Sequence, residues 1–179
     1  MNREIRFFDY EQCYRYYSKG IESVRQKRIN GETIVAKPVL MVAIIDGIDA
    51  NVFVNNQFVL NDWIEERYKK LMMQFTKNSQ FDGTTGIEKP FWHLETDGFW
   101  HLNYQGEQLS KSHTPSKAWI KDNVEFAYFD ESLWILLQNK VWRTKLRDYI
   151  VEHKLTDDFW SGKMATERLS ILAAVLLVA

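Results

Sequence analysis

Cysteine is almost absent from this sequence, and so is an excess of charge of either sign. The single Cys13 among 179 residues excludes an internal disulfide framework and any cysteine-based zinc site. The formal net charge of −1 argues against a protein coated in basic charge, but it leaves room for a local basic patch. The first residues do not have the pattern of a signal peptide, so the expected compartment is the cytoplasm.

An apolar run long enough to cross a bilayer is also lacking. The longest, residues 169–179, has about eleven residues, whereas a membrane-spanning helix needs about 20. We interpret this run as a buried helix, with an oligomer contact or the stump of a longer chain as alternatives. We then expect residues 1–155 to form the main domain and residues 156–179 to form a C-terminal helical extension of it, which is not an independent domain. No membrane partner is expected.

Recognisable catalytic signatures are lacking as well. No glycine-rich run followed by Lys and Ser or Thr forms a phosphate loop. Nothing fits the order of a His-Asn-His nuclease, and Glu152-His153-Lys154 has no Pro-Asp partner on a nearby strand. His93, His101 and Glu95 are too few for a zinc site. We therefore assign no catalytic residue, no metal ligand and no cofactor, with an unrecognised enzyme site around the two histidines as a minor alternative.

Aromatic side chains are abundant, at 15% of the sequence. Residues 91–102 alternate apolar and polar side chains around Thr96-Asp97-Gly98, which predicts a β-hairpin with a three-residue loop. In that register one face is buried and carries Trp92, Leu94, Trp100 and Leu102. The other face carries Phe91, His93, Phe99 and His101.

Helical periodicity dominates the rest of the chain. We expect helices over residues 8–28, 38–48, 61–75 and 140–154, and shorter ones capped by Thr114 and Asp130. The helix over 38–48 is apolar nearly all round, so it should run through the core. The expected fold is mainly α with a small β-hairpin, an α+β fold with a winged-helix-like outline.

Basic residues suggest where an anion would bind. Lys37 and Lys89 each precede a proline, which disfavours helical backbone at the lysine. We therefore expect both lysines to be extended and to present their ammonium groups to phosphate. The helix that begins at Pro38 adds a favourable dipole.

Two motifs together resemble a known family. Lys37-Pro38-Val39-Leu40 opens an apolar run, and an aromatic helix separates it from Pro90-Phe91-Trp92-His93-Leu94 and Asp97-Gly98-Phe99-Trp100. Over about residues 30–153, this pattern resembles the sulfur-binding domain of McrA-like restriction endonucleases. The resemblance implies a DNA-recognition module of a restriction or defence system. Such a module reads DNA whose backbone carries a phosphorothioate, in which sulfur replaces a non-bridging oxygen.

The resemblance also implies a site. In that family the sulfur lies in a shallow apolar cavity while basic groups hold the surrounding phosphates. By position, the cavity would form where residues 89–91 meet Ala36 and Lys37. Two positions depart from the family, because Lys89 stands where an aromatic is common and Val35-Ala36 where a His or Arg is common. The candidate DNA-binding residues are Lys37, Lys89, Pro90, Phe91, His93, His101, Arg25, Lys27 and Arg28.

Double-stranded DNA is therefore the expected partner. The nuclease domain of the relatives has no counterpart in these residues, so a separate nuclease protein or a second copy of the chain is a further candidate partner. The alternative function is a protein-interaction or oligomerisation module that keeps the fold without the DNA surface. Net charge favours this alternative, whereas the clustered Arg and Lys of residues 15–37 favour DNA.

Overall fold

The computed structural model describes residue 7 and residues 9–76, 85–106 and 108–155. The helices are α1 Tyr10–Glu22, α2 Ala36–Asp49, α3 Asp62–Phe75, α4 Glu88–His93, α5 Lys117–Asn123, α6 Glu131–Gln138 and α7 Lys140–Ile150. The strands are β1 Arg28–Ile29, β2 Glu32–Thr33, β3 Trp100–Tyr104 and β4 Val124–Phe129. The mainly helical α+β class is confirmed. The predicted C-terminal extension, 156–179, lies outside the described residues.

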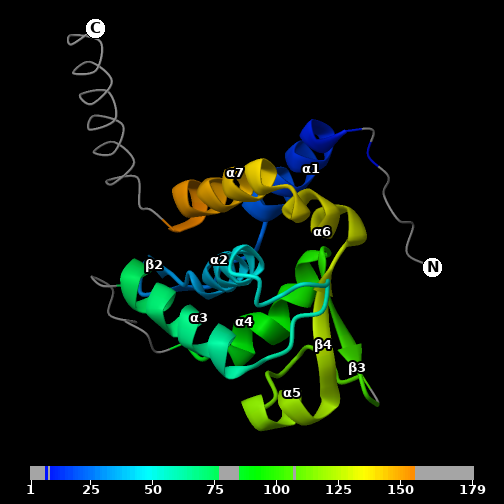
Figure 1. The fold of residues 1–179 in the computed structure, drawn as a ribbon. Helices are drawn as coiled ribbons and strands as arrows, with labels where there is room; N and C mark the ends of the chain where they lie inside the picture. The colour runs from blue at the N-terminus through cyan, green and yellow to red at the C-terminus, as the bar shows by residue number, and fades with distance from the viewer. Residues whose placement is uncertain (1–6, 8, 77–84, 107, 156–179) are drawn as a thin grey trace, which may run out of the picture.

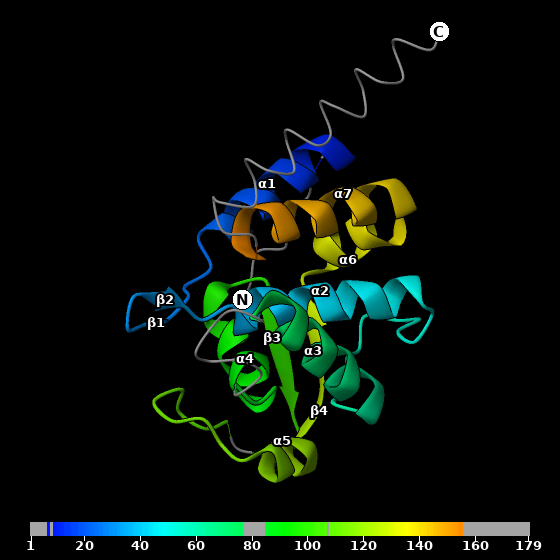
Figure 2. The same cartoon turned by 90° about the vertical axis from the view of Figure 1, so that its left-hand side faces the viewer.

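Helix α2 forms the centre of the fold and lies between two layers (Figures 1 and 2). Helices α1, α6 and α7 cover one side, and α3, α4 and the β3–β4 pair lie on the other. Every residue from Pro38 to Ile45 is buried, which confirms the prediction of a core helix. The helix begins at Ala36, because proline is tolerated in the first turn, where the missing N–H has no intrahelical acceptor.

The predicted hairpin over residues 91–102 is wrong. Residues 88–93 form α4, a 3-10 turn follows over Leu94–Asp97, and Gly98 ends it in the left-handed region with a φ of 92°. Strand β3 then pairs antiparallel with β4, so that Trp100 lies opposite Phe129. The alternation in 100–104 is therefore satisfied by a strand some twenty residues away and not by a local turn.

The burial predicted for the tryptophans is nevertheless confirmed. Trp92, Leu94 and Trp100 are fully buried and Leu102 is 6% exposed. Trp100 stacks on Phe58 with ring centroids 5.6 Å apart, and its indole N–H donates to the carbonyl of Phe91 at 3.0 Å. Phe91 and Phe99, which the hairpin register placed on the other face, are buried too, because the helical turn of α4 points Phe91 into the core.

Helix α1 is shorter than predicted and ends at Glu22. Residues 28–33 instead form the β1–β2 hairpin, with Asn30 and Gly31 at positive φ in the turn between the strands. An Asn-Gly pair is favoured in such two-residue turns because both positions need positive φ. Cys13 on α1 is buried, as expected for a structural thiol, and burial raises its pKa to about 11.

Of the three predicted N-caps, only one forms the expected capping hydrogen bond among the described residues. Asn61 caps α3 as expected, because its side chain accepts from the amide of Ile64 at 3.1 Å. Thr114 does not begin a helix, since Ser116 caps α5 by accepting from the amide of Trp119. Asp130 occupies the N-cap position of α6, but its carboxylate makes no capping hydrogen bond. The last predicted helix ends at Ile150 and continues as a π-helical turn, Val151–Leu155.

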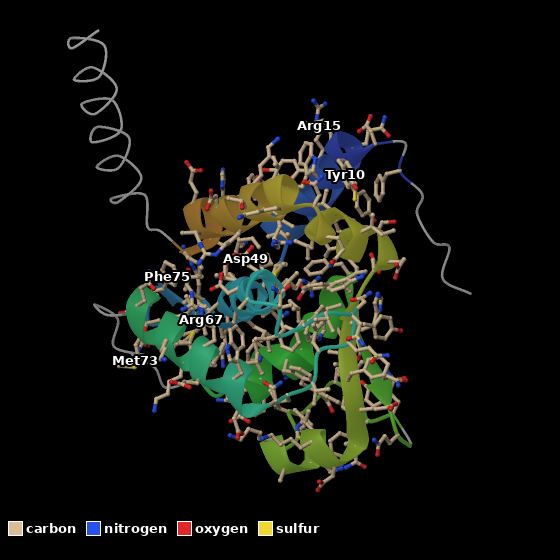
Figure 3. All side chains as sticks on the ribbon, in the orientation of Figure 1. Tyr10, Arg15, Asp49, Arg67, Met73 and Phe75 are labelled. Carbon is tan, nitrogen blue, oxygen red and sulfur yellow. The ribbon has the colours of Figure 1, made fainter. Side chains whose placement is uncertain are left out.

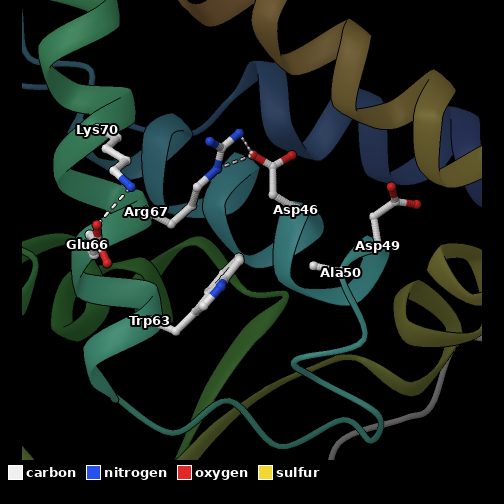
Figure 4. A pocket seen from close by; sticks show the side chains of 7 residues that line it. All are labelled: Asp46, Asp49, Ala50, Trp63, Glu66, Arg67 and Lys70. Atoms are coloured by element: carbon white, nitrogen blue, oxygen red, sulfur yellow. Dashed lines mark hydrogen bonds and ion pairs between the residues drawn. The ribbon is translucent and has the colours of Figure 1, made fainter.

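One carboxylate joins α2 to both layers. Asp46 of α2 accepts from Arg67 of α3 and, at 2.6 Å, from Arg147 of α7. Figure 4 shows the contact with Arg67 in close view. Among the described residues, no helix is both long enough and apolar enough to cross a membrane.

Candidate nucleic-acid interface

An open groove of about 680 Å³ lies beside the first turns of α2 and α4. Three parts of the chain meet around it: the segment from Arg25 to Lys37, the stretch from Thr85 to Thr96, and Thr114. We call this the basic groove. Most of the predicted DNA-binding residues line it, namely Arg25, Lys27, Lys37, Lys89, Pro90 and His93.

The backbone of the two pre-proline lysines is not extended, so that prediction is wrong. Lys37 lies in the first turn of α2 and Lys89 in the first turn of α4. The bias that proline imposes on the preceding residue is modest, and here the helical turns override it. The first turn of α2 borders the groove, and no side chain caps it.

The groove cations differ in whether they are already paired. The ammonium group of Lys37 lies 2.6 Å from a carboxylate oxygen of Asp97, and both side chains are largely buried. The other carboxylate oxygen of Asp97 accepts from the backbone amide of Arg25 at 3.4 Å. By contrast, Lys89, Arg25 and Lys27 are exposed, and their side chains form no ion pair with any described residue. The unpaired charge therefore lies at the rim of the groove.

His93 forms part of the groove wall. Its Nε2 atom lies 2.7 Å from the hydroxyl oxygen of Thr114. Burial lowers the pKa of His93, and the positive charges of Lys37 and Lys111 lower it further. The imidazole is therefore mainly neutral at pH 7 and can donate or accept one hydrogen bond according to its tautomer.

Lys111 anchors the loop that carries Thr114. Its ammonium group lies 2.6 Å from Glu95, donates to the hydroxyl of Tyr104 at 2.8 Å, and lies 3.3 Å from the ring centroid of Trp92. These contacts fix the loop against α4 and β3 and so hold the wall of the groove. Neither Lys111 nor Asp97 was predicted as a site residue, because each acts through contacts distant in sequence.

Three predicted site residues, Phe91, Arg28 and His101, are not among the residues that line the groove. Phe91 is buried in the core against Trp100. Arg28 is exposed on β1 and donates to the hydroxyl of Thr33 at 3.4 Å. His101 lies 2.6 Å from Asp130, which also accepts from the hydroxyl of Tyr17. His93 and His101 therefore do not face each other, and no group of three potential metal ligands occurs among the described residues.

A second hollow, of about 440 Å³, lies at the opposite end of α2 (Figure 4). Its cations are already neutralised, Arg67 by Asp46 and Lys70 by Glu66. A third hollow, of about 420 Å³, lies between α1 and α6, and Tyr10 of α1, which is 42% exposed, lines it (Figure 3). No basic side chain lines it. Among these three hollows, the basic groove is the one whose lining includes cations without an ion-pair partner in the part of the chain that the structure describes.

Comparison with known proteins identifies the family. The family described as ScoMcrA-like, DNA sulfur-binding domain matches residues 18–166. The fold is similar to the sulfur-binding domain of ScoMcrA complexed with phosphorothioated DNA, with a TM-score of 0.59 and 19% identity over 77% of this chain and 86% of that one. It is also similar to the structure of the sulfur-binding and SRA domains of ScoMcrA complexed with phosphorothioated DNA, with a TM-score of 0.59 and 18% identity.

That second match covers 76% of this chain but only 41% of the ScoMcrA chain. No curated protein sequence matches this one. The family match covers most of the chain, including every element from α2 to α7. The chain therefore belongs to the ScoMcrA-like DNA sulfur-binding domain family.

Proposed function

We propose that this chain is a DNA-recognition module that binds double-stranded DNA in the basic groove and reads a phosphorothioate in its backbone. One observation carries the proposal. Residues that are far apart in sequence, from the segment before α2, from α4 and from the loop at Thr114, line one groove, and its exposed cations form no ion pair with the residues that the structure describes. Family membership supports the same function.

The groove offers a suitable surface for each part of a modified backbone. Lys89, Arg25 and Lys27 are exposed and suited to phosphate oxygens, which bind cations in a salt-dependent way. Ala36 and Pro90 are buried apolar residues of the groove lining, and we call these two residues the apolar floor. Sulfur is larger and less strongly hydrated than oxygen, so an apolar surface loses less free energy by removing its water.

The direct test is binding to two duplexes of the same sequence, one with and one without a single phosphorothioate, at two salt concentrations. We expect tighter binding to the modified duplex and weaker binding to both as salt increases. Equal affinity for the two duplexes would remove the sulfur-reading part of the proposal. Failure to bind either duplex at low salt would favour the protein-interaction alternative.

Lys89→Ala tests whether the groove is the DNA site. We expect it to weaken binding to both duplexes and to reduce the salt slope by about one ion, because one phosphate contact is lost. Lys140→Ala is the matched control, because Lys140 is an exposed lysine on α7, outside the groove lining. Should the two variants bind alike, the DNA surface lies elsewhere.

A further inference from the structure

We propose that Asp97 determines specificity in the basic groove by neutralising Lys37 beside the apolar floor. This inference rests on the proposed function and adds a cause for selectivity at the same site. With Lys37 paired, an ordinary phosphate oxygen gains little at this point of the groove. A sulfur atom depends less on a nearby cation than an oxygen does. The affinity for the modified duplex therefore rises relative to the affinity for the unmodified duplex.

The geometry makes Asp97 a fixed partner of Lys37. The two charged groups are 2.6 Å apart, and the side chains of Lys37 and Asp97 are only 15% and 6% exposed. Asp97 is the last residue of the 3-10 turn, directly before the left-handed Gly98, and it also accepts from the backbone amide of Arg25. A bound phosphate would have to compete with a preformed and more deeply buried carboxylate.

The apolar floor of the groove and its exposed rim therefore differ in the charge that they offer to DNA. A lysine that an internal carboxylate already neutralises does not neutralise a DNA phosphate, so it displaces no counterion from the DNA, whereas exposed Lys89, Arg25 and Lys27 can. Lys37 borders Ala36 and shares the groove with Pro90. The apolar floor therefore lies beside a charge-balanced pair, which offers little compensation for the desolvation of a phosphate oxygen.

Asp97→Asn removes the negative charge while preserving the shape of the side chain and an oxygen that accepts from Lys37. We expect affinity for the unmodified duplex to increase about tenfold, as for one new charge-assisted hydrogen bond, and the salt slope to steepen by about one ion. The modified duplex should gain less, because sulfur is the weaker hydrogen-bond acceptor. The ratio of the two affinities therefore falls.

Asp49→Asn is the matched control for net charge. Asp49 is also a paired aspartate, but it lies at the opposite end of α2, where Arg143 contacts it at 2.7 Å. The same gain of one positive charge there should leave the affinity ratio unchanged. If Asp97→Asn strengthens binding to unmodified DNA no more than Asp49→Asn does, or leaves the affinity ratio intact, the inference is wrong.

A double variant, Lys37→Met with Asp97→Asn, tests the same idea without leaving a buried charge unpaired. It replaces an ion pair with no net charge by two uncharged side chains, so the net charge of the groove does not change. We therefore expect the double variant to have the same salt slope as the wild type. A slope smaller by about one ion would mean that Lys37 contacts a phosphate directly, which overturns the inference. Preference of the wild-type protein for the modified duplex would still uphold the proposed function in that case. A wild-type protein that binds neither duplex removes both.

Discussion

His93 experiences three influences that disfavour its protonated form. Burial contributes most to the lowering of its pKa, followed by the positive charges of Lys37 and Lys111. In the unfolded chain a histidine titrates at about pH 6.5. The unfolded state therefore binds a proton at His93 more readily than the folded state. The contribution of His93 to the free energy of unfolding is therefore fully present above the pKa of the unfolded state. This contribution decreases as the pH falls through the lower pKa that His93 has in the folded state.

We predict that His93→Gln flattens this pH dependence. Urea unfolding at several pH values between about 7.5 and 5 should show a smaller loss of stability in the variant than in the wild type. Glutamine keeps a polar group that can bond Thr114, so the variant should fold normally at pH 7.5. Parallel curves for the two proteins would show that His93 is not desolvated as described.

Interpretation of single residues depends on whether sequence neighbours decide their environment. Lys89 and Pro90 border the predicted groove because α4 presents them together at its first turn. It failed where the partner is distant, as for His101, whose contact with Asp130 spans 29 positions. The pairing of Lys37 with Asp97 spans 60 positions, and Asp97 was predicted as a loop residue within a family motif, not as the partner of Lys37.

At the scale of elements, Gly47 allows Phe53 to pack against α2. A methyl group on Gly47 would lie 2.6 Å from ring atoms of Phe53 and 3.0 Å from Trp63. We predict that Gly47→Ala destabilises the protein by about 1–3 kcal/mol, because the overpacking exceeds the gain in helix propensity. Thermal or urea unfolding measures the change.

Gly20 is the matched control on α1. It is helical like Gly47, but apart from its chain neighbours and the backbone of α1, no heavy atom of the described residues lies within 4 Å of the position that its Cβ would occupy. Gly20→Ala should therefore stabilise the protein by about 0.5–1 kcal/mol, which is the intrinsic advantage of alanine over glycine in a helix. A loss of stability at both positions would mean that crowding is not the cause.

Elements with a strong local signal were predictable and those with a non-local partner were not. The apolar run of α2 and the Asn61 cap of α3 specify their helices with neighbouring residues alone. The stretch 91–102 alternates as a hairpin does, yet it forms part of α4, a 3-10 turn and β3. Strand β4 was missed, although Val124-Glu125-Phe126-Ala127-Tyr128-Phe129 is rich in aromatic residues, which favour strands.

At the scale of the whole molecule, Asp46 connects the two layers through α2. We predict that Asp46→Ala costs about 2 kcal/mol, less than for a fully buried pair because Arg67 and Arg147 are partly exposed. The loss arises because both guanidinium groups remain without their carboxylate. Urea unfolding of the variant measures it.

Glu66→Ala is the control for that change. Glu66 lines the same hollow and pairs with Lys70, but both side chains are mostly exposed. Removing this carboxylate should change the midpoint of unfolding very little. If the two variants lose equal stability, Asp46 is an ordinary surface carboxylate and does not join the layers.

The net charge of the whole molecule does not reveal the local positive charge of the groove. Away from the groove many cations have a carboxylate partner, such as Arg67 with Asp46, Arg143 with Asp49 and Lys117 with Glu65. The rim cations of the groove have no such partner among the described residues. A total of −1 is therefore compatible with a locally positive surface, and composition alone was unable to distinguish DNA from protein as the partner.

The buried Cys13 has a practical consequence for work on this protein. It is the only cysteine in the sequence, and with a pKa of about 11 only about one thiol in ten thousand is ionised at pH 7. Alkylating dyes react with thiolates, so a cysteine introduced at an exposed rim position would carry the label almost alone. The wild-type background is thus suited to single-site fluorophores that report on DNA, with no native thiol to remove first.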